Sequence, residues 1–305
     1  MRTLAVISLF ATVAFAQSSP LIPTGISTNC TDFLTSFNED SSLTSCTSPL
    51  IKATAAFGPN GTADSTSSDV TTALSSVCSG ASACSATTIQ SKLASFYAAC
   101  TDELTTSANA EVLRLYDVLY SVYPYTQALC TKDNSGNYCA AEIVTASSSA
   151  ASASASGAPE SLASIAKTLW SPITGSDSQS TIAIVPNATT FANSNILFLL
   201  LGPSLTSSQI CTACTRNILT SYINFESNSP YGPGLTNSPL LHGQSALYTE
   251  VQSLCGASFL NGAVAAAGGL SGGILSGAAP RMASSSSGAL GAMMGATLIA
   301  LLASL

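Results

Sequence analysis

Apolar side chains recur with the spacing of an α-helix along much of the chain. Residues 89–104 and 112–123 each place large apolar and aromatic side chains on one helical face. A third stripe of this kind runs through residues 210–225. A shorter fourth helix is expected over residues 244–255, with Gly256 as its stop signal. Because each stripe is wide enough to face a core, the pattern predicts an all-α fold.

Local signals at the helix ends refine these boundaries. Pro124 is expected to end the second helix, because proline lacks the backbone amide and clashes with the preceding turn. Ser207 and Ser208 are candidate caps for the third stripe. In the same way, Ser68 and Asp69 are candidate caps for a further helix that follows them.

Shorter segments complete the expected elements. Residues 195–201 are very apolar and end at Gly202, which predicts a short buried helix. Residues 181–185 are the single stretch that the pattern predicts to be a strand. Residues 146–158 are nearly pure Ser and Ala, so we expect a disordered internal loop, and residues 261–276 are expected to form a Gly/Ala/Ser-rich stalk.

The first residues have the three features of a secretory signal peptide. Arg2 supplies the charged region, residues 4–15 form a short apolar run, and residues 14–16 form an A-x-A cleavage site. Gln17 is therefore expected to begin the mature protein. The alternative is an N-terminal helix buried in the fold.

The last residues have the order of a glycosylphosphatidylinositol (GPI) attachment signal. Three small residues, Ser276 and the two after it, precede a polar spacer over 279–287 and an uncharged tail over 288–305. We expect attachment at Ser276, with Ser271 and Asn261 as fallback candidates. The alternative is a transmembrane anchor, which the missing basic flank disfavours.

Charge is scarce throughout the chain. Charged residues make up 8% of the sequence, and the net charge is −7. Without the expected signal peptide and tail, which contain Arg2 and Arg281, the 8 basic residues fall to 6 against 15 acidic ones, so the net charge becomes −9. This excludes the basic face that a nucleic-acid binder needs.

Ten cysteines remain in the expected mature chain, and an even number in a secreted protein is typical of disulfides. The pair Cys211 and Cys214 forms a CxxC motif, which can be a thioredoxin-like redox site or two structural cysteines that each bridge elsewhere. No βαβ pattern surrounds the motif, so we favour the structural interpretation. The predicted disulfide cysteines are Cys30, Cys46, Cys78, Cys84, Cys100, Cys130, Cys139, Cys211, Cys214 and Cys255.

The cysteine spacing indicates a degenerate two-fold repeat. Residues 84–130 and residues 211–255 are similar in length, and each span opens and closes with a cysteine beside an amphipathic helix. The cysteines also divide into five up to Cys100 and five from Cys130 onward. Because five is odd, at least one disulfide is expected to join the two groups.

Candidate modification sites are present, but catalytic motifs are weak. The sequons predict N-glycosylation at Asn29, Asn60 and Asn187. His242 is the one histidine, and no acidic residue is placed by the sequence to orient it. A G-x-S-x-G match around Ser271 lies in the Ala/Gly-rich stretch without the strand and helix that such a motif requires. We therefore predict no catalytic residue, no cofactor and no metal site, and we favour a protein without enzymatic activity, with an extracellular enzyme as a third alternative.

Three strings resemble a family of fungal GPI-anchored cell-surface proteins whose central domain has no assigned function. They are residues 117–120 (DVLY), residues 211–220 (CTACTRNILT) and residues 238–248, which contain SPLL and QSALY. The resemblance covers about residues 30–260, except the Ser/Ala loop. It implies a location at the fungal plasma membrane or cell wall, and it carries over no active site.

The expected organisation follows from these features, and two functions remain open. The segments are a signal peptide (1–16), a first helical cysteine-rich half (17–145), the Ser/Ala loop (146–158), a second such half (159–260), the stalk (261–276) and a propeptide (277–305). The favoured function is a structural or interaction role at the cell surface, with membrane contact through the GPI lipid and cell-wall glucan as a further candidate partner.

The alternative function is a module that binds a small apolar ligand such as a sterol or lipid. That function requires a cavity of ligand size between the helices. The residues expected to line such a cavity are Phe96, Tyr116, Leu119, Phe198 and Tyr222. Tight packing of these side chains would favour the structural role.

Overall fold

The computed structural model describes residues 22–43, 47–48, 67–80, 84–143, 168–174, 181–202 and 205–260. Within these ranges the chain is predominantly helical, with one two-stranded sheet, which confirms the predicted fold class. No helix among the described residues is long and apolar enough to cross a membrane. The expected signal peptide, Ser/Ala loop, stalk and propeptide lie outside the described residues, as do Cys46, Asn60, Asn261, Ser271 and Ser276.

The elements follow one another in a simple order. The first part of the chain holds helices α1 (Thr28–Phe37), α3 (Ser67–Gly80), α4 (Ala86–Ala99), α5 (Thr101–Leu104) and α6 (Ala110–Leu129). The second part holds strands β1 (Trp170–Thr174) and β2 (Thr181–Pro186), helices α9 (Ala188–Ser194), α10 (Ser207–Ile210), α11 (Ala213–Asn228) and α12 (Gln244–Cys255), and 3-10 turns η3 (Ile196–Phe198) and η4 (Leu235–Asn237).

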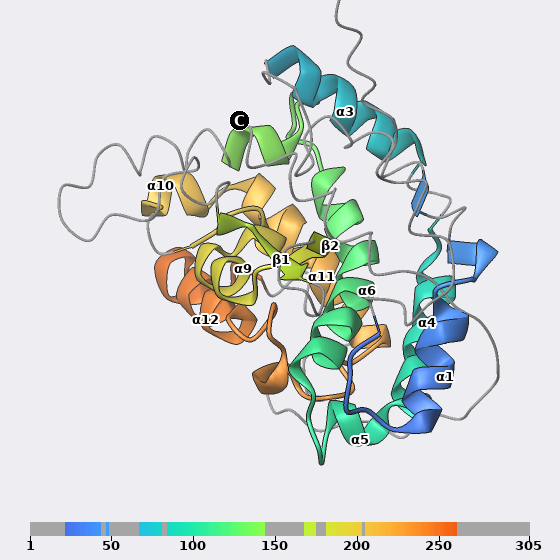
Figure 1. Ribbon diagram of the computed structural model, residues 1–305. Coiled ribbons are helices and arrows are strands. Elements are labelled where there is room, and N and C mark those ends of the chain that lie inside the picture. Colours follow the sequence, from blue (N-terminus) through green and yellow to red (C-terminus); the bar gives the residue numbers. More distant parts are fainter. Residues whose placement is uncertain are drawn as a thin grey trace, which may run out of the picture.

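Helix α6 is the centre of the fold. Figure 1 shows it between the pair α1 and α4 on one side and the group α9 to α12 on the other, with α3 across one end. Helix α6 packs directly against α4 and α11. Fourteen of its 20 residues are buried, so it is apolar on nearly every face, as a helix enclosed by others must be.

The prediction that Pro124 ends this helix is wrong. Helix α6 continues past Pro124 to Leu129. The residues after the proline include Tyr125 and Leu129, which are buried in the core, and the helix is followed by Cys130, which is disulfide-bonded to Cys78. Packing and this crosslink offset the roughly 3 kcal/mol that a proline inside a helix costs.

The third apolar stripe is divided between two helices. Helix α10 ends at Ile210 and α11 begins at Ala213. The caps are Thr206 and Thr212 rather than the predicted Ser207 and Ser208. Thr206 forms a capping box in which its amide donates to the Gln209 side-chain oxygen at 2.9 Å. The Thr212 hydroxyl accepts a hydrogen bond from the Thr215 amide at 3.2 Å. Helix α3 likewise begins at Ser67, so the expected caps Ser68 and Asp69 lie inside its first turn. Helix α12 spans the predicted residues and ends before Gly256, which has a positive φ of 89°.

The apolar run 195–201 is buried but forms only the 3-10 turn η3 instead of a helix. Asn195, Leu199 and Leu200 all have positive φ angles, which interrupt a regular helix. The side-chain amide of Asn195 donates to the carbonyl oxygen of Leu201 at 2.9 Å and closes the run on itself. Burial of three successive leucines stabilises this unusual backbone.

The predicted strand is confirmed as β2, and its antiparallel partner β1 was not predicted. Strand β1 contains Pro172, which lowers its strand signal. Helices α1 and α9 were also missed, because neither is long enough to give a clear apolar stripe. Their polar caps, Ser27 and Asn187, identify where they begin.

Disulfides connect distant parts of this fold. Cys30–Cys100 joins the start of α1 to the end of α4, and Cys78–Cys130 joins α3 to the end of α6. Two further bridges are Cys139–Cys214 and Cys211–Cys255. Cys84 is also disulfide-bonded, and no described cysteine is free. The predicted crosslink between the two cysteine groups is therefore confirmed by Cys78–Cys130.

The CxxC motif is structural, as predicted. Cys211 and Cys214 bridge to Cys255 and Cys139 and not to each other. The bridges also differ between the two similar spans. Cys211 pairs with Cys255 across its span, whereas Cys130 pairs with Cys78 and not with Cys84.

Candidate functional site

A fully buried carboxyl group, Asp117, lies in the middle of α6. Its exposed fraction is 0%. One oxygen accepts a hydrogen bond from the Tyr231 hydroxyl, and the other accepts from the Ser238 hydroxyl at 2.7 Å and from the Leu240 amide at 2.8 Å. All three donors come from the segment between α11 and α12. Asp117 therefore attaches this segment, residues 229–243, to the central helix.

The same segment also contacts α4 and α6 through aromatic rings. Tyr231 packs edge-on against Tyr116 and Tyr120, with ring centroids 5.3 and 5.1 Å apart. A Cβ atom on Gly232 would lie 2.7 Å from the Tyr97 ring. The backbone thus approaches α4 so closely that only glycine fits there without a shift.

A second buried carboxyl group, Glu226, lies on α11 and is 2% exposed. One of its oxygens accepts from the side-chain amide of Gln244, the first residue of α12. The same Gln244 nitrogen lies 2.8 Å from the Tyr248 hydroxyl. Glu226 therefore attaches the start of α12 to α11.

This second cluster contains two polar atoms without partners. The other Glu226 oxygen and the Gln244 side-chain oxygen are both buried, and no hydrogen bond reaches them. An unpartnered buried polar atom costs about 1–3 kcal/mol relative to water. The contact between α11 and α12 is therefore weaker than its burial alone suggests.

Burial shifts the ionisation of both carboxyl groups toward the neutral form. It raises the pKa of Asp117 from 3.8 to about 7, although the hydrogen bonds from Tyr231, Ser238 and Leu240 oppose the shift. Burial likewise raises the pKa of Glu226 from 4.5 to about 8, opposed only by the hydrogen bond from Gln244. The two sites thus differ in how well they accommodate a negative charge.

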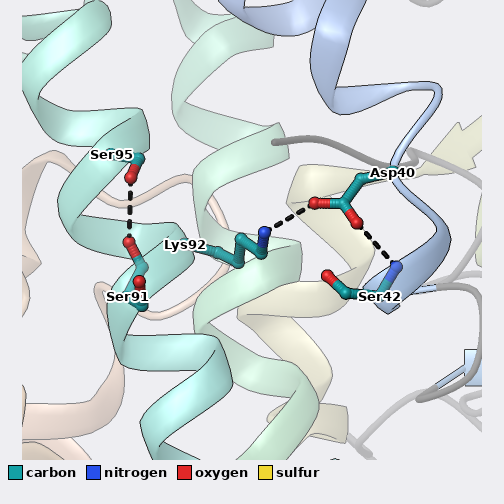
Figure 2. A network of polar contacts seen from close by, with 5 residues as sticks. All are labelled: Asp40, Ser42, Ser91, Lys92 and Ser95. Carbon is teal, nitrogen blue, oxygen red and sulfur yellow. Dashed lines mark hydrogen bonds and ion pairs between the residues drawn. The ribbon is translucent and has the colours of Figure 1, made fainter. Parts of the chain in front are cut away.

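Two other carboxyl groups, Asp40 and Glu103, have lowered rather than raised pKa values. Figure 2 shows Lys92 of α4 pointing toward Asp40, with 2.5 Å between the Lys92 nitrogen and an Asp40 oxygen. Burial opposes ionisation of Asp40, but hydrogen bonds from Lys92 and Ser42 outweigh it and lower its pKa. Burial also opposes ionisation of Glu103, but hydrogen bonds from Ser27, including the amide at 2.6 Å, lower its pKa. The first pair connects the residues after α1 to α4, and the second connects the N-cap of α1 to α5.

The predicted site residues lie in different places. Asn29 is exposed on α1. Asn187 caps α9 through its side-chain oxygen, so the nitrogen that would carry a glycan is not used by the cap. His242 is exposed, and one ring nitrogen lies 3.0 Å from the Ser238 carbonyl oxygen.

The side chains of Cys30, Cys100 and Glu103 lie close enough together to be considered as metal ligands. The two cysteines are bonded to each other, however, so neither offers a thiolate to a metal.

Four of the residues expected to line an apolar cavity pack against each other as two pairs of rings. The rings of Phe96 and Tyr116 are 5.4 Å apart, and those of Phe198 and Tyr222 are 4.6 Å apart. Leu119 is 3% exposed in the same core. A shallow hollow lies elsewhere, on the outer face of α12, where Ser245, Thr249 and Leu254 are among its lining residues.

Neither buried carboxyl group was predicted from the sequence. The signal for Asp117 was an acidic residue inside the apolar stripe of α6, between Tyr116 and Val118. The signal for Glu226 was similar, directly after Phe225. The strings that carry the resemblance include Asp117, Ser238 and Gln244, and the fold brings all three into these two clusters.

One comparison with known proteins gives a match. Residues 16–167 match a domain of unknown function (DUF7729). The DUF7729 domain contains α1 to α6 and therefore Asp117, but it excludes the residues that donate to Asp117 and all of α11 and α12. No curated protein and no solved structure matches the chain.

Proposed function

We propose that the chain is a secreted glycoprotein of the fungal cell surface or cell wall, held at the outer face of the plasma membrane by a GPI lipid on Ser276. The bonded state of every described cysteine is the observation that carries the proposal. Structural disulfides of this density persist in oxidising compartments and are rare in the cytosol. The signal-like start and the GPI-like end of the sequence point to the same location.

The helical domain has a structural or interaction role in this proposal, without enzymatic activity. The two carboxyl groups with raised pKa values, Asp117 and Glu226, are enclosed in the core and connect elements of the fold. Cell-wall glucan is the candidate partner that the proposed location supplies. Contacts among Phe96, Tyr116, Phe198 and Tyr222 favour this role over transport of a small apolar ligand.

Treatment of membranes with a phospholipase specific for GPI tests the anchor. We expect the enzyme to release the full helical domain into the soluble fraction, because the lipid would be its sole attachment to the bilayer. The control is Ser276→Pro combined with proline at Ser271 and Asn261, which blocks every candidate attachment residue and should leave no releasable surface protein. Protein that stays in the membrane fraction and still contains residues 293–305 would contradict the proposal.

A further inference from the structure

Helix α12 is held differently at its two ends. Its last residue, Cys255, is covalently bonded to Cys211. The residues just before α12 are attached to α6 by Asp117, whose carboxyl group accepts a hydrogen bond from the Leu240 amide at 2.8 Å. Between these two attachments, the first turns of α12 are fixed to α11 by the Glu226–Gln244–Tyr248 contacts.

The first turn of α12 also lacks the support that other helices receive. Its N-cap is Gly243, and no side chain caps the helix. By contrast, α6 and α11 are capped by Asn109 and Thr212. Two of the unpartnered buried atoms, on Glu226 and Gln244, lie where α12 meets α11. Opening of this turn would give both atoms access to water.

Glu226 and Asp117 respond differently when they lose a proton. Ionised Asp117 keeps three donors, and its partners Tyr231 and Ser238 are hydroxyl groups that can either donate or accept. Ionised Glu226 has one donor and one oxygen without any partner. A buried charge without sufficient partners is strongly unfavourable, so its release to water favours an open state.

Among the residues that the structure describes, the groups around Glu226 supply no positive charge. Tyr120 from α6, Tyr222 from α11 and Tyr248 from α12 face it, with Asp117 beyond Tyr120. The basic residues in the described part of the chain contact other groups: Lys92 pairs with Asp40, Arg114 with Glu111, Lys132 with the Tyr138 ring and Arg216 with Phe259. His242 is exposed and contacts the Ser238 carbonyl.

We propose that Glu226 is a proton-controlled switch. Loss of its proton releases the first two turns of α12 from α11, while the Asp117 contacts and the Cys211–Cys255 disulfide keep the segment attached at both ends. Because burial raises the pKa of Glu226 from 4.5 to about 8, the closed form binds the proton more tightly than the open form between these values. The opening equilibrium therefore increases about ten-fold per pH unit in this window.

Amide hydrogen exchange of the secreted protein with intact disulfides tests this switch. After correction for intrinsic exchange, we expect the protection of residues 244–251 to fall about ten-fold for each pH unit between pH 5 and pH 7. Amides in the centre of α6 should remain more protected at every pH. Equal protection of α6 and α12 throughout would contradict local opening, and so would protection of α12 that does not change with pH.

Matched variants assign the effect to one carboxyl group. Glu226→Gln should remove the pH dependence in residues 244–251, whereas Glu250→Gln on the outer face of α12 should preserve it. If Glu250→Gln removes the dependence instead, the switch is not Glu226. If Glu226→Gln does not fold, the infrared band of a protonated carboxylic acid can be followed in Asp117→Asn, which lacks the other buried carboxyl group with a raised pKa. That band should weaken over the same pH range in which α12 loses protection, and its absence at pH 6 would overturn the proposal.

Discussion

Reduction of the disulfides is expected to unfold this protein under conditions in which high salt has little effect. The four bridges between described cysteines close loops with sequence separations of 70, 52, 75 and 44 residues. Each bridge of this length stabilises a fold by about 4 kcal/mol in the loop-entropy model. Because the loops overlap, the total is smaller than the sum, but it remains on the order of 10 kcal/mol and comparable to the stability of a whole domain.

Ion pairs cannot substitute for these bridges. The pairs between described residues are Lys92–Asp40 and Arg114–Glu111. Arg114–Glu111 is partly exposed, and such pairs contribute only about 0–1 kcal/mol. Lys92–Asp40 is largely buried, so the cost of desolvating both charges offsets much of their attraction. Thermal unfolding followed by circular dichroism, with and without reductant at low and high salt, measures both contributions. The double variant Cys211→Ala with Cys255→Ala should give an intermediate loss. A reduced protein that keeps a cooperative transition within a few degrees of the oxidised one would show that packing alone is sufficient.

Replacement of Asp117 is expected to give the largest effect of any single carboxyl group. Asp117→Ala would leave the Tyr231 hydroxyl, the Ser238 hydroxyl and the Leu240 amide without their acceptor inside the core. Unpartnered buried donors cost about 1–3 kcal/mol each, so we expect the free energy of unfolding to fall by roughly 3 kcal/mol or more. Denaturant unfolding with intact disulfides measures this loss. Asp32→Ala, at an exposed position of α1, should change the same quantity by less than about 0.5 kcal/mol.

The pH dependence of stability gives a second readout of Asp117. Its pKa is raised in the folded protein to about 7, so the folded state binds more protons than the unfolded state between pH 4 and pH 7. The free energy of unfolding therefore falls as the pH rises through this window. The lowered pKa values of Asp40 and Glu103 act at more acidic pH, where stability is lost as the pH falls. Asp117→Asn should make the decline less steep, and the part that remains is expected from Glu226, whose pKa is also raised. A wild-type protein more stable at pH 8 than at pH 5 would contradict this prediction.

The sequence predicted the elements whose signals are local. Helix α12 has its apolar stripe and its glycine stop in one short segment, and both its bounds are as predicted. The break between α10 and α11 was not visible, because the apolar stripe continues across it and only Thr212 indicates a new start. Pro124 led to a wrong helix end because the free-energy cost of a proline inside a helix is offset when α6 packs against α4 and α11, which lie elsewhere in the sequence.

The clusters around Asp117 and Glu226 could not be assembled from local signals. Asp117 and its donor Leu240 are 123 residues apart, and no local sequence pattern indicates that they are in contact. The acidic residue within the apolar stripe was visible, but its partners were not. The disulfides were predictable as a set because every cysteine has the same chemistry, whereas their connectivity required the fold.

Peptide mapping by mass spectrometry of the mature, unreduced protein, purified from the organism that expresses it, tests the proposed processing and the disulfide pairing together. We expect a chain that begins at Gln17, carries glycans on Asn29, Asn60 and Asn187, and ends at Ser276 with the ethanolamine of a GPI lipid. Crosslinked peptides should contain Cys139 with Cys214 and Cys211 with Cys255. A mature protein that retains residues 1–16 or 277–305, or that contains these four cysteines as free thiols, would contradict the account.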